Sequence, residues 1–466
     1  MNSCLRICSP PHGLSVTPAF ARVNHRDRIY CFHNGRISTS ADSSCADGQL
    51  LHGSENKLYT QLSIYANVDI DSLSPFNRLV IPPLPERVVV YDSTLRDGEQ
   101  MPGVRFSLEQ KVAIARKLDE VGVHQIEAGF PAVSGSERDS VRAIAGLGLD
   151  AEVLCLARTL EQDIDAAVDC DVDMVLLFIA TSDLHLRCKL KMSRDQVLER
   201  AVKATEYAAA HGLRVSMSTE DTTRSDLQFV KDIYLACHDA GAERVGVTDT
   251  LGCASPEAIS YVVGEIRSAL DVPLSAHLHN DFGLATVNSI AALSAGADAI
   301  ATTVGGIGER AGNVPLEQLV MVLKNLYGKD IGISTEGLTE LGKLVFEAAG
   351  VSLPPNQPWI GPNAFSHESG IHVAAVLNCP MTYECVSPES VGNRRRLVLG
   401  KHSGKSIVRS RLSEREVDAT QDQICEIVRE IKRRGEQHGR VSDDEFWTIV
   451  DAVLSGSAGM QNCGEG

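Results

Sequence analysis

The chain has 466 residues, of which 43% are hydrophobic and 23% are charged, and its net charge is −17. This length and composition are typical of a globular protein that buries a large core. The acidic balance argues against nucleic acid or an anionic membrane as the main partner, and no apolar run approaches the length of a membrane span.

The N-terminal segment differs in composition from the rest of the chain. Residues 1–60 carry four cysteines and stretches rich in Ser, His and Arg such as STSADSSCADG, with little apolar periodicity. We expect residues 1–73 to be a disordered or artefactual extension. Because residues 1–41 hold five arginines and one acid, an organelle transit peptide is the alternative. The thirteen cysteines include no Cys-x-x-Cys pair, which favours a reducing cytoplasm over a disulfide scaffold.

From residue 88 onward, short β-branched runs alternate with amphipathic helical stretches. The predicted strands cover 88–92, 124–128, 151–157, 173–179, 213–218, 243–248, 272–278 and 298–303. The predicted helices cover 107–121, 136–147, 160–169, 193–211, 226–241, 255–270, 284–295 and 315–327. These strand–helix units predict an α/β fold, a (β/α)8 TIM barrel over residues 74–350. An open doubly wound sheet is disfavoured because its glycine-rich phosphate fingerprint does not follow the first strand.

The barrel pattern stops near residue 350. Residues 351–365 are rich in Pro and Gly, which indicates an ordered linker and not a helix. A polar segment with several histidines follows, and two helices are then predicted at 415–434 and 442–455. We therefore expect residues 351–466 to form a linker and a small, mostly helical accessory region.

Polar side chains follow several predicted strands directly. They are Arg96 and Asp97 after the first strand, Glu220 after the fifth, Thr250 after the sixth, and His277 and His279 on the seventh. All of these positions lie at the carboxyl ends of strands, the face on which TIM-barrel enzymes build their active sites. The sequence therefore predicts a catalytic site on this face.

Two of these histidines suggest a metal site. His277 and His279 are spaced i, i+2, so both side chains point the same way from a strand. With a facing carboxylate, for which Asp97 is the natural candidate, two neutral imidazoles can hold a divalent metal ion and leave positions open. A pair of hydrogen-bonded core histidines is the alternative.

Two other features leave alternatives open. Glu220 either orients substrate or relays protons, or else it pairs with Arg224 at the start of the next helix. The glycines of GGIGERAGN, residues 305–313, form either a turn that binds a phosphate or carboxylate, or simply a tight turn.

Six motifs, in this order, make the chain recognisable: DSTLRDGEQMPGV, EAGFPAVS, HLHNDFGLA, GGIGERAGN, HESGIHVAA and LGKHSG. Over residues 74–455 the chain resembles the isopropylmalate and homocitrate synthase family. These enzymes are metal-dependent acyltransferases that condense acetyl-CoA with a 2-oxo acid on a (β/α)8 barrel. The resemblance implies that Asp97, His277 and His279 ligate Mg2+, Mn2+ or Zn2+, with Asn313 close to the ion.

The resemblance also implies roles in catalysis. Arg96 would stabilise the developing alkoxide and enolate charge, and Glu220, His372 and Tyr383 would transfer protons. Substrate contacts are expected from Thr250, Gln100 and Ser218. In this family the segment that carries His372 and Tyr383 reaches the neighbouring subunit's barrel, so a homodimer with shared sites is implied.

The identity of the oxo acid depends on smaller resemblances. SPFN at 74–77, FIATSDLHL at 178–186 and HVAAVLNCPMTYE resemble the homocitrate synthases of methanogenic archaea, which begin coenzyme B biosynthesis. The chain also ends without the regulatory domain of most isopropylmalate synthases. We therefore expect condensation of acetyl-CoA with 2-oxoglutarate, and with longer 2-oxo diacids, to homocitrate and CoA. The alternatives are 2-isopropylmalate synthase acting on 2-oxoisovalerate, citramalate synthase acting on pyruvate, and an acyl-CoA lyase of the same superfamily.

Two positions depart from the pattern of the lysine-pathway homocitrate synthases. Those enzymes usually have Glu at the position of Asp97, and at the position of Ser216 they have an arginine that holds the distal carboxylate of 2-oxoglutarate. Another cation must therefore do this work here. Arg158, at the end of the third predicted strand, is our candidate, and a surface salt bridge is its alternative.

Overall fold

The structure, a computed structural model, describes residues 31–33, 36–38 and 73–456. The chain divides into two compact units, Met1–Gln61 and Leu62–Gly466. In the first unit, strands β1 (Cys31–His33) and β2 (Arg36–Ser38) pair antiparallel. Most of the segment expected to be disordered or artefactual, and with it the alternative of a transit peptide, lies outside the described residues.

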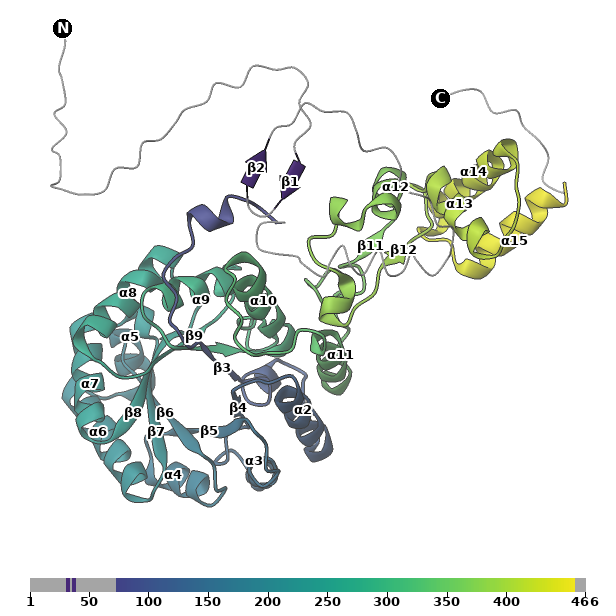
Figure 1. Cartoon of the computed structure of the whole chain (residues 1–466). Coiled ribbons are helices and arrows are strands. Elements are labelled where there is room, and N and C mark those ends of the chain that lie inside the picture. The colour runs from purple at the N-terminus through teal and green to yellow at the C-terminus, as the bar shows by residue number, and fades with distance from the viewer. Residues whose placement is uncertain (1–30, 34–35, 39–72, 457–466) are drawn as a thin grey trace, which may run out of the picture. The chain divides into compact units, whose positions relative to one another are not determined.

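Eight parallel strands close into a barrel in the second unit (Figure 1). The strands are β3 (Val89–Asp92), β4 (Gln125–Glu127), β5 (Glu152–Arg158), β6 (Met174–Ala180), β7 (Arg214–Glu220), β8 (Ala242–Asp249), β9 (Leu274–Leu278) and β10 (Ala299–Thr302). They pair in chain order, and the barrel closes where β10 pairs with β3, with Thr302 opposite Asp92. The predicted TIM barrel is therefore confirmed.

Helices surround these strands, as Figure 1 shows. They are α2 (Leu108–Glu120), α3 (Gly135–Ala145), α4 (Glu161–Val168), α6 (Arg194–Ala210), α7 (Leu227–Asp239), α8 (Pro256–Ala269), α9 (Ala285–Ser294) and α10 (Leu316–Met321). Helices α2 and α6 begin with capping boxes, in which Ser107 and Ser193 exchange hydrogen bonds with Gln110 and Gln196. The helix predicted at 315–327 is α10 followed by a π-helical turn, Val322–Leu326.

Apolar side chains pack against both faces of the barrel sheet. Between strands and helices lie fully buried residues such as Ile114, Leu118, Ile126 and Leu177. The interior of the barrel is packed by a separate cluster made of Tyr91, Leu154, Met174, Leu176, Ala299 and Ala301. Because this interior is filled, a ligand can enter only at an end of the barrel.

The chain beyond the barrel starts with α11 (Leu338–Ala349), which the sequence analysis missed. The predicted linker, 351–365, contains neither helix nor strand. The remaining elements are β11 (Ser366–His367), α12 (Gly370–Asn378), β12 (Arg396–Leu397), α13 (Lys405–Glu414), α14 (Gln421–His438) and α15 (Asp443–Leu454). Helices α12 to α15 bury their own hydrophobic cluster, which includes Val373, Ile407, Ile427 and Phe446.

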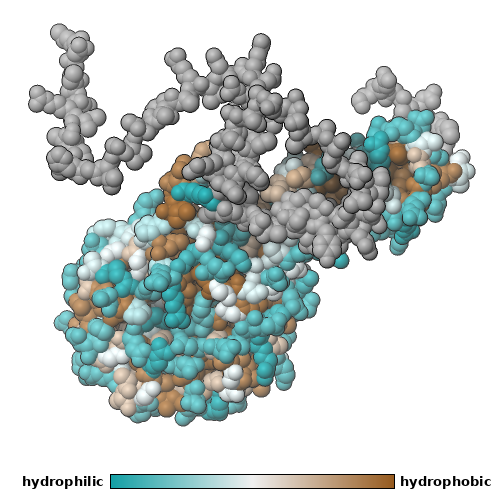
Figure 2. All heavy atoms as spheres, in the orientation of Figure 1, coloured by the Kyte–Doolittle hydropathy of each residue, from teal (hydrophilic) through white to brown (hydrophobic). Residues whose placement is uncertain are grey.

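Hydrophilic residues cover much of the surface in the view of Figure 2, with hydrophobic patches between them. Among the large apolar side chains that stay exposed, Phe76, Leu79 and Val80 precede the barrel and are more than 70% exposed. None of the helices within 73–456 is long and apolar enough to cross a membrane.

Candidate active site

A cleft of about 270 Å3 lies at the carboxyl ends of the barrel strands. Predicted site residues that line it are Arg96, Asp97, Gln100, Ser218, Glu220, Thr250, His277 and His279. One side of the lining is apolar and aromatic, with Phe130, Leu156, Leu176 and Phe178. The structure therefore brings together most of the residues that the sequence pointed to.

The loop after β3 holds Arg96 in a fixed position. Its Nε and Nη2 donate to the two carboxylate oxygens of Glu127 at 2.7 and 3.0 Å, and its Nη1 donates to Asp97 at 2.6 Å. Glu127 also accepts a hydrogen bond from Ser93 Oγ and is fully buried on β4. Charge-assisted, bidentate contacts of this kind give an arginine a defined orientation. Arg96 is therefore held as a fixed cation in the wall of the cleft.

Asp97, His277 and His279 form a group that fits a divalent metal ion. Their nearest ligand atoms all lie within 4.8 Å of one another. The two Nε2 atoms are 3.2 Å apart, and His277 Nε2 is 3.7 Å from Asp97 Oδ2. Ligands bound at about 2.0–2.2 Å to one tetrahedral ion are separated by about 3.3–3.6 Å, so these spacings suit a shared ion.

The electrostatics of the group agree with this interpretation. Burial, reinforced by His279, lowers the pKa of His277 to about 3, and burial also lowers the pKa of His279. Burial alone would raise the pKa of Asp97, but the Arg96 guanidinium and the hydrogen bond from Asn313 outweigh it and hold that pKa below its ordinary value. Two neutral imidazoles and a carboxylate are the protonation states that metal ligation requires. Both histidine Nδ1 atoms are buried without a hydrogen-bond partner among the described residues.

Glu220 reaches the cleft from the end of β7, but its partner is not the expected one. Arg224 pairs with Asp221, at 2.7 and 2.8 Å, so the interpretation of Glu220 as the partner of Arg224 is wrong. Instead, Lys189 Nζ contacts the two oxygens of Glu220 at 2.7 and 2.6 Å. Glu220 is thus ion-paired and still lines the cleft.

Thr250 connects two loops at the rim of the cleft. Its Oγ1 accepts a hydrogen bond from the backbone N–H of Asp221 at 2.8 Å. Its carbonyl oxygen accepts one from Arg310, which also pairs with Asp281. The hydroxyl therefore has one hydrogen bond to the protein while it lines the cleft.

Arg158 does not line the cleft, contrary to its predicted role at the distal carboxylate. Its Nε and Nη2 donate to Asp163 at 2.7 and 2.9 Å, and its side chain is 52% exposed. The geometry favours the alternative of a surface salt bridge. Ser216 is fully buried below the cleft and accepts a hydrogen bond from Arg244 Nε at 3.0 Å.

His372 and Tyr383 are brought together, but away from the cleft lining of their own chain. Their rings stack with centroids 3.8 Å apart. Tyr383 is 45% exposed and lines a different cavity of about 530 Å3 with Trp359 and Met381. Neither residue is among those that line the barrel cleft.

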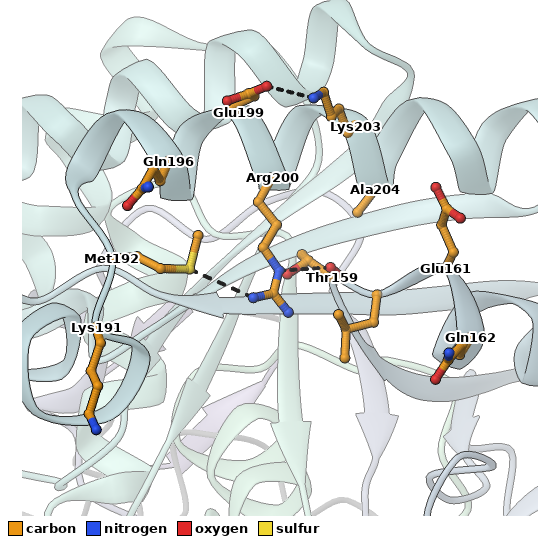
Figure 3. A pocket seen from close by; sticks show the side chains of 11 residues that line it. Thr159, Glu161, Gln162, Lys191, Met192, Gln196, Glu199, Arg200, Lys203 and Ala204 are labelled. Atoms are coloured by element: carbon orange, nitrogen blue, oxygen red, sulfur yellow. Dashed lines mark hydrogen bonds and ion pairs between the residues drawn. The ribbon is translucent and has the colours of Figure 1, made fainter.

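A larger cavity, of about 710 Å3, lies between α4 and α6 and contains none of the predicted site residues (Figure 3). Its lining includes Lys191, Arg200 and Lys203 together with Glu161 and Glu199. Lys203 pairs with Glu199, and Arg200 donates to the carbonyl oxygen of Thr159. We therefore place the chemistry in the smaller cleft.

Glu127, Lys189 and His185 are site residues that were not predicted from the sequence. For Glu127 a signal existed, because an acid inside a predicted, buried strand is costly unless it is paired. Lys189 and His185 lie in the connection after β6, several residues beyond the end of the predicted strand, so reasoning from strand ends did not reach them. Their contacts with Glu220 and Asp221 depend on tertiary structure alone.

Comparisons with known proteins cover the whole barrel and the segment after it. The model of the HMGL-like family matches residues 87–345, and the model described as homocitrate synthase post-HMGL domain-like matches residues 359–439. Homocitrate synthase AksA of Methanopyrus kandleri is 54% identical over 371 residues, which cover 80% of this chain and 94% of that protein. The 2-isopropylmalate synthase of Methanocaldococcus jannaschii is 45% identical and covers 80% of this chain and 72% of its own.

Solved structures agree on the fold. The HMG-CoA lyase of Bacillus subtilis matches with a TM-score of 0.53 at 21% identity, covering 58% of this chain and 97% of that one. This likeness shows the barrel fold and no more.

Proposed function

The chain belongs to the homocitrate and isopropylmalate synthase family, and we propose on that basis that it condenses acetyl-CoA with a 2-oxo acid. The proposed oxo acid is 2-oxoglutarate or a longer 2-oxo diacid, and the products are homocitrate, or its longer homologue, and CoA. Relatives named homocitrate synthase, at 54% and 50% identity, support this choice. The observation that carries the proposal is the cleft that Arg96, Asp97, Glu220, His277 and His279 line together.

The residues of the cleft divide the chemistry between them. A divalent cation held by Asp97, His277 and His279 would polarise the ketone of the oxo acid. Glu220 accepts a proton from the methyl carbon of acetyl-CoA, and the electron pair of that C–H bond forms the enolate. The enolate carbon attacks the ketone carbon, so that a C–C bond forms and the ketone oxygen becomes an alkoxide. Arg96, which Glu127 and Asp97 orient, stabilises this negative charge.

The reaction then needs an acid and a hydrolytic step. Thr250, Gln100 and Ser218, which line the cleft, are the proposed contacts of the substrate. The alkoxide takes a proton, and water hydrolyses the thioester to a carboxylate and free CoA. Because hydrolysis of the thioester is strongly favourable, it makes the condensation effectively irreversible.

We assign the acid to a second copy of the chain. His372 and Tyr383 stack on one another outside the cleft of their own chain, so a homodimer in which the partner's His372 and Tyr383 complete the site accounts for them. The exposed apolar residues Phe76, Leu79, Val80 and Ile371 support such an interface, since large apolar side chains in solvent favour association.

One observation favours a second candidate, an isopropylmalate or citramalate synthase. The wall formed by Phe130, Leu156, Leu176 and Phe178 suits the apolar side chain of 2-oxoisovalerate or pyruvate. The two cations in the lining, Arg96 and Arg310, are each paired with carboxylates of the protein.

A thiol-release assay with acetyl-CoA and four oxo acids tests the proposal. It compares 2-oxoglutarate, 2-oxoadipate, 2-oxoisovalerate and pyruvate at equal concentrations. A preference for the two diacids supports the homocitrate synthase, and a preference for either monoacid supports the second candidate. Cleavage of a hydroxyacyl-CoA without any oxo acid would assign the chain to the lyases.

A further inference from the structure

The connection between β6 and α6 carries two charged side chains to the end of β7. Ser182 caps a short helix, α5 (Asp183–His185), by accepting a hydrogen bond from the backbone N–H of His185. The chain continues in a π-helical turn, Leu186–Leu190, which ends at Lys191 in the left-handed region with φ +55°. Single π-helical turns are rare and recur at functional sites.

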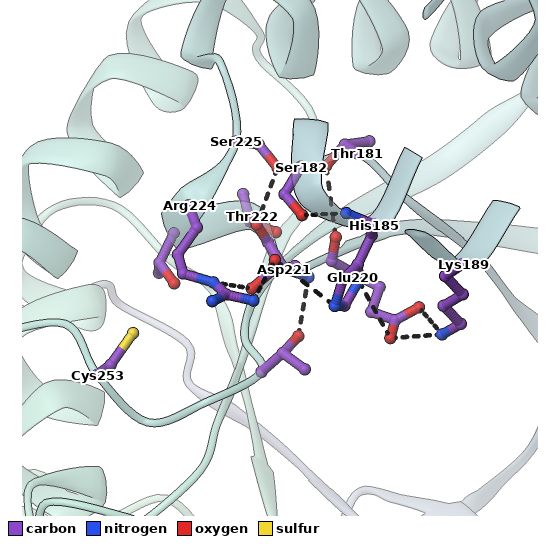
Figure 4. Close-up of polar contacts among 12 residues, drawn as sticks. Thr181, Ser182, His185, Lys189, Glu220, Asp221, Thr222, Arg224, Ser225 and Cys253 are labelled. Carbon is purple, nitrogen blue, oxygen red and sulfur yellow. Dashed lines mark hydrogen bonds and ion pairs between the residues drawn. The ribbon is translucent and has the colours of Figure 1, made fainter. Parts of the chain in front are cut away.

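Lys189, on this π-helical turn, forms an ion pair with Glu220 at the end of β7 (Figure 4). Its Nζ contacts Oε1 and Oε2 of Glu220 at 2.7 and 2.6 Å. The carboxylate is 19% exposed, whereas the lysine side chain is 49% exposed. The orientation of Glu220 therefore depends on a residue that is not part of the cleft lining.

His185 lies between Glu220 and its neighbour Asp221. Its Nδ1 is 3.7 Å from Glu220 Oε1, and its Nε2 is 3.8 Å from Asp221 Oδ2. Asp221 is fully buried, is paired with Arg224 and has a left-handed backbone with φ +64°. A non-glycine residue keeps this conformation only where surrounding contacts hold it, and such residues cluster at active sites. The end of β7 is thus fixed on both sides, by Arg224 on Asp221 and by Lys189 on Glu220.

Stability alone is a poor explanation for the Lys189–Glu220 pair. Half-exposed ion pairs contribute little to folding, because solvent screens them and ordering two long side chains costs entropy. A general base, in contrast, works only within hydrogen-bond reach of the proton that it removes, and a free glutamate side chain has many rotamers. We propose that Lys189 is the positioning residue of Glu220, supported by His185, and holds its carboxylate at the methyl group of acetyl-CoA. This inference rests on the proposed function, in which Glu220 is the base.

The test compares Lys189→Met and Lys189→Arg with the wild type and a matched control, Lys203→Met. Lys203 makes a similar contact with Glu199, at 2.5 Å, on α6 and away from the cleft. Steady-state rates are measured with acetyl-CoA and the oxo acid that the wild type uses best. We expect Lys189→Met to lower kcat by about 10- to 100-fold, since misplacement of a reacting group by about 1 Å costs up to about 100-fold, with KM for the oxo acid little changed. Lys189→Arg should recover part of the rate, and Lys203→Met should match the wild type.

A kinetic isotope effect separates positioning from general damage. With acetyl-CoA trideuterated on the methyl group, the isotope effect on kcat should rise in Lys189→Met, because proton removal becomes slower than the later steps. An unchanged kcat, an equal loss in Lys203→Met, or a loss with an unchanged isotope effect would overturn the inference. A loss confined to diacid substrates would also overturn it and make Lys189 a carboxylate-binding residue.

Two further readouts keep the test decisive. If Lys189→Met is less stable in thermal unfolding, Lys189→Arg, which keeps the charge, and His185→Gln are compared with the wild type instead. His185→Gln should lower kcat and raise the isotope effect, as expected for Lys189→Met. Wild-type kcat and isotope effect in His185→Gln would overturn the inference. A wild type that releases no thiol with any oxo acid would instead refute the proposed function.

Discussion

Asn313 Nδ2 donates a hydrogen bond to Asp97 Oδ1 at 2.7 Å and so joins two loops that are 216 residues apart in the sequence. The same amide donates to the carbonyl oxygen of Ile307 at 3.2 Å, within the glycine-rich loop 305–313. Gly305 N–H in that loop donates to the buried carboxylate of Glu317 at 3.0 Å. The glycine-rich loop therefore binds a carboxylate of the protein itself, and its tight turns serve to orient Asp97.

Removal of a histidine from the group Asp97, His277 and His279 should abolish metal binding. In His277→Ala the cation loses one of three protein ligands, and we expect the bound metal per chain, measured by elemental analysis after dialysis, to fall to background. His211→Ala is the control, because His211 is exposed and contacts the backbone of Tyr207. Full metal occupancy in His277→Ala would show that the ion binds elsewhere.

Gly308→Ala should weaken the metal site without a change at any ligand. An added Cβ would collide with the side-chain amide of Asn313 and lie 2.8 Å from Asp97 Oδ1, at a φ of +152°. We expect metal affinity, measured by competition with a chelator, to fall by about 10- to 100-fold, as for the loss of other groups that orient metal ligands. Gly103→Ala is the matched control, because φ there is +90° but no atom lies within 4 Å of the added Cβ. An equal loss in both variants would attribute the effect to backbone strain.

Glu127→Gln should slow catalysis by releasing Arg96. The substitution keeps the shape of the side chain but replaces one acceptor oxygen by a donor, so the paired contact with Arg96 is lost. We expect kcat to fall by about 100-fold, the usual cost of losing a positioned donor at a developing oxyanion. Glu152→Gln, which breaks the half-exposed pair with Arg214, should leave kcat unchanged. A raised KM with an unchanged kcat would show that Arg96 only binds the substrate.

Asp92 should make stability depend on pH. Burial raises the pKa of Asp92 from 3.8 to about 7, and this outweighs its hydrogen bonds from Thr94 and Thr302. The folded protein thus binds this proton more tightly than the unfolded chain, so the stabilisation is complete below pH 3.8 and is lost as the pH rises to about 7. In urea unfolding, the stability of the wild type relative to Asp92→Asn should fall by about 1.4 kcal/mol per pH unit across this window. A difference that does not vary with pH would contradict the raised pKa.

Complementation between two inactive variants tests the shared site. Arg96→Ala and His372→Ala should each be inactive alone. If the partner's His372 completes each cleft, unfolding and refolding the two together should restore about a quarter of the wild-type activity, because half of the random dimers carry one intact site. No recovery, with dimers present in size-exclusion chromatography, would place both residues in the same site of one chain.

Sequence patterns predicted the barrel well because short, mostly buried strand runs alternate with amphipathic helices, several of which begin at a capping serine or aspartate. Every predicted strand overlaps an observed one, and the strand predicted at 272–278 is β9 (Leu274–Leu278). The C-terminal helices were less predictable. The helix predicted at 415–434 starts only at Gln421, where Thr420 and Gln423 form a capping box, and α13 (Lys405–Glu414) was not predicted. That pattern, Thr followed three residues later by Gln, was a usable signal.

Some residues of the candidate site could be predicted from the sequence, and others could not. His277, His279 and Asp97 could be predicted because strand geometry and strand ends determine where they lie. The role of Arg158 could not be predicted, since only the structure shows that its side chain forms an ion pair with Asp163. The role of Lys189 could not be predicted from the sequence, because its contact with Glu220 depends on the π-helical turn on which it lies.

The cleft is proposed to perform a metal-dependent condensation of acetyl-CoA with an oxo acid. The most direct measurement is thiol release by wild-type protein stripped of metal, with and without Mn2+ and with and without an oxo acid. We expect release only when both Mn2+ and an oxo acid are present, and none from His277→Ala under the same conditions. Release that needs no metal, or that proceeds without an oxo acid, would contradict this proposal.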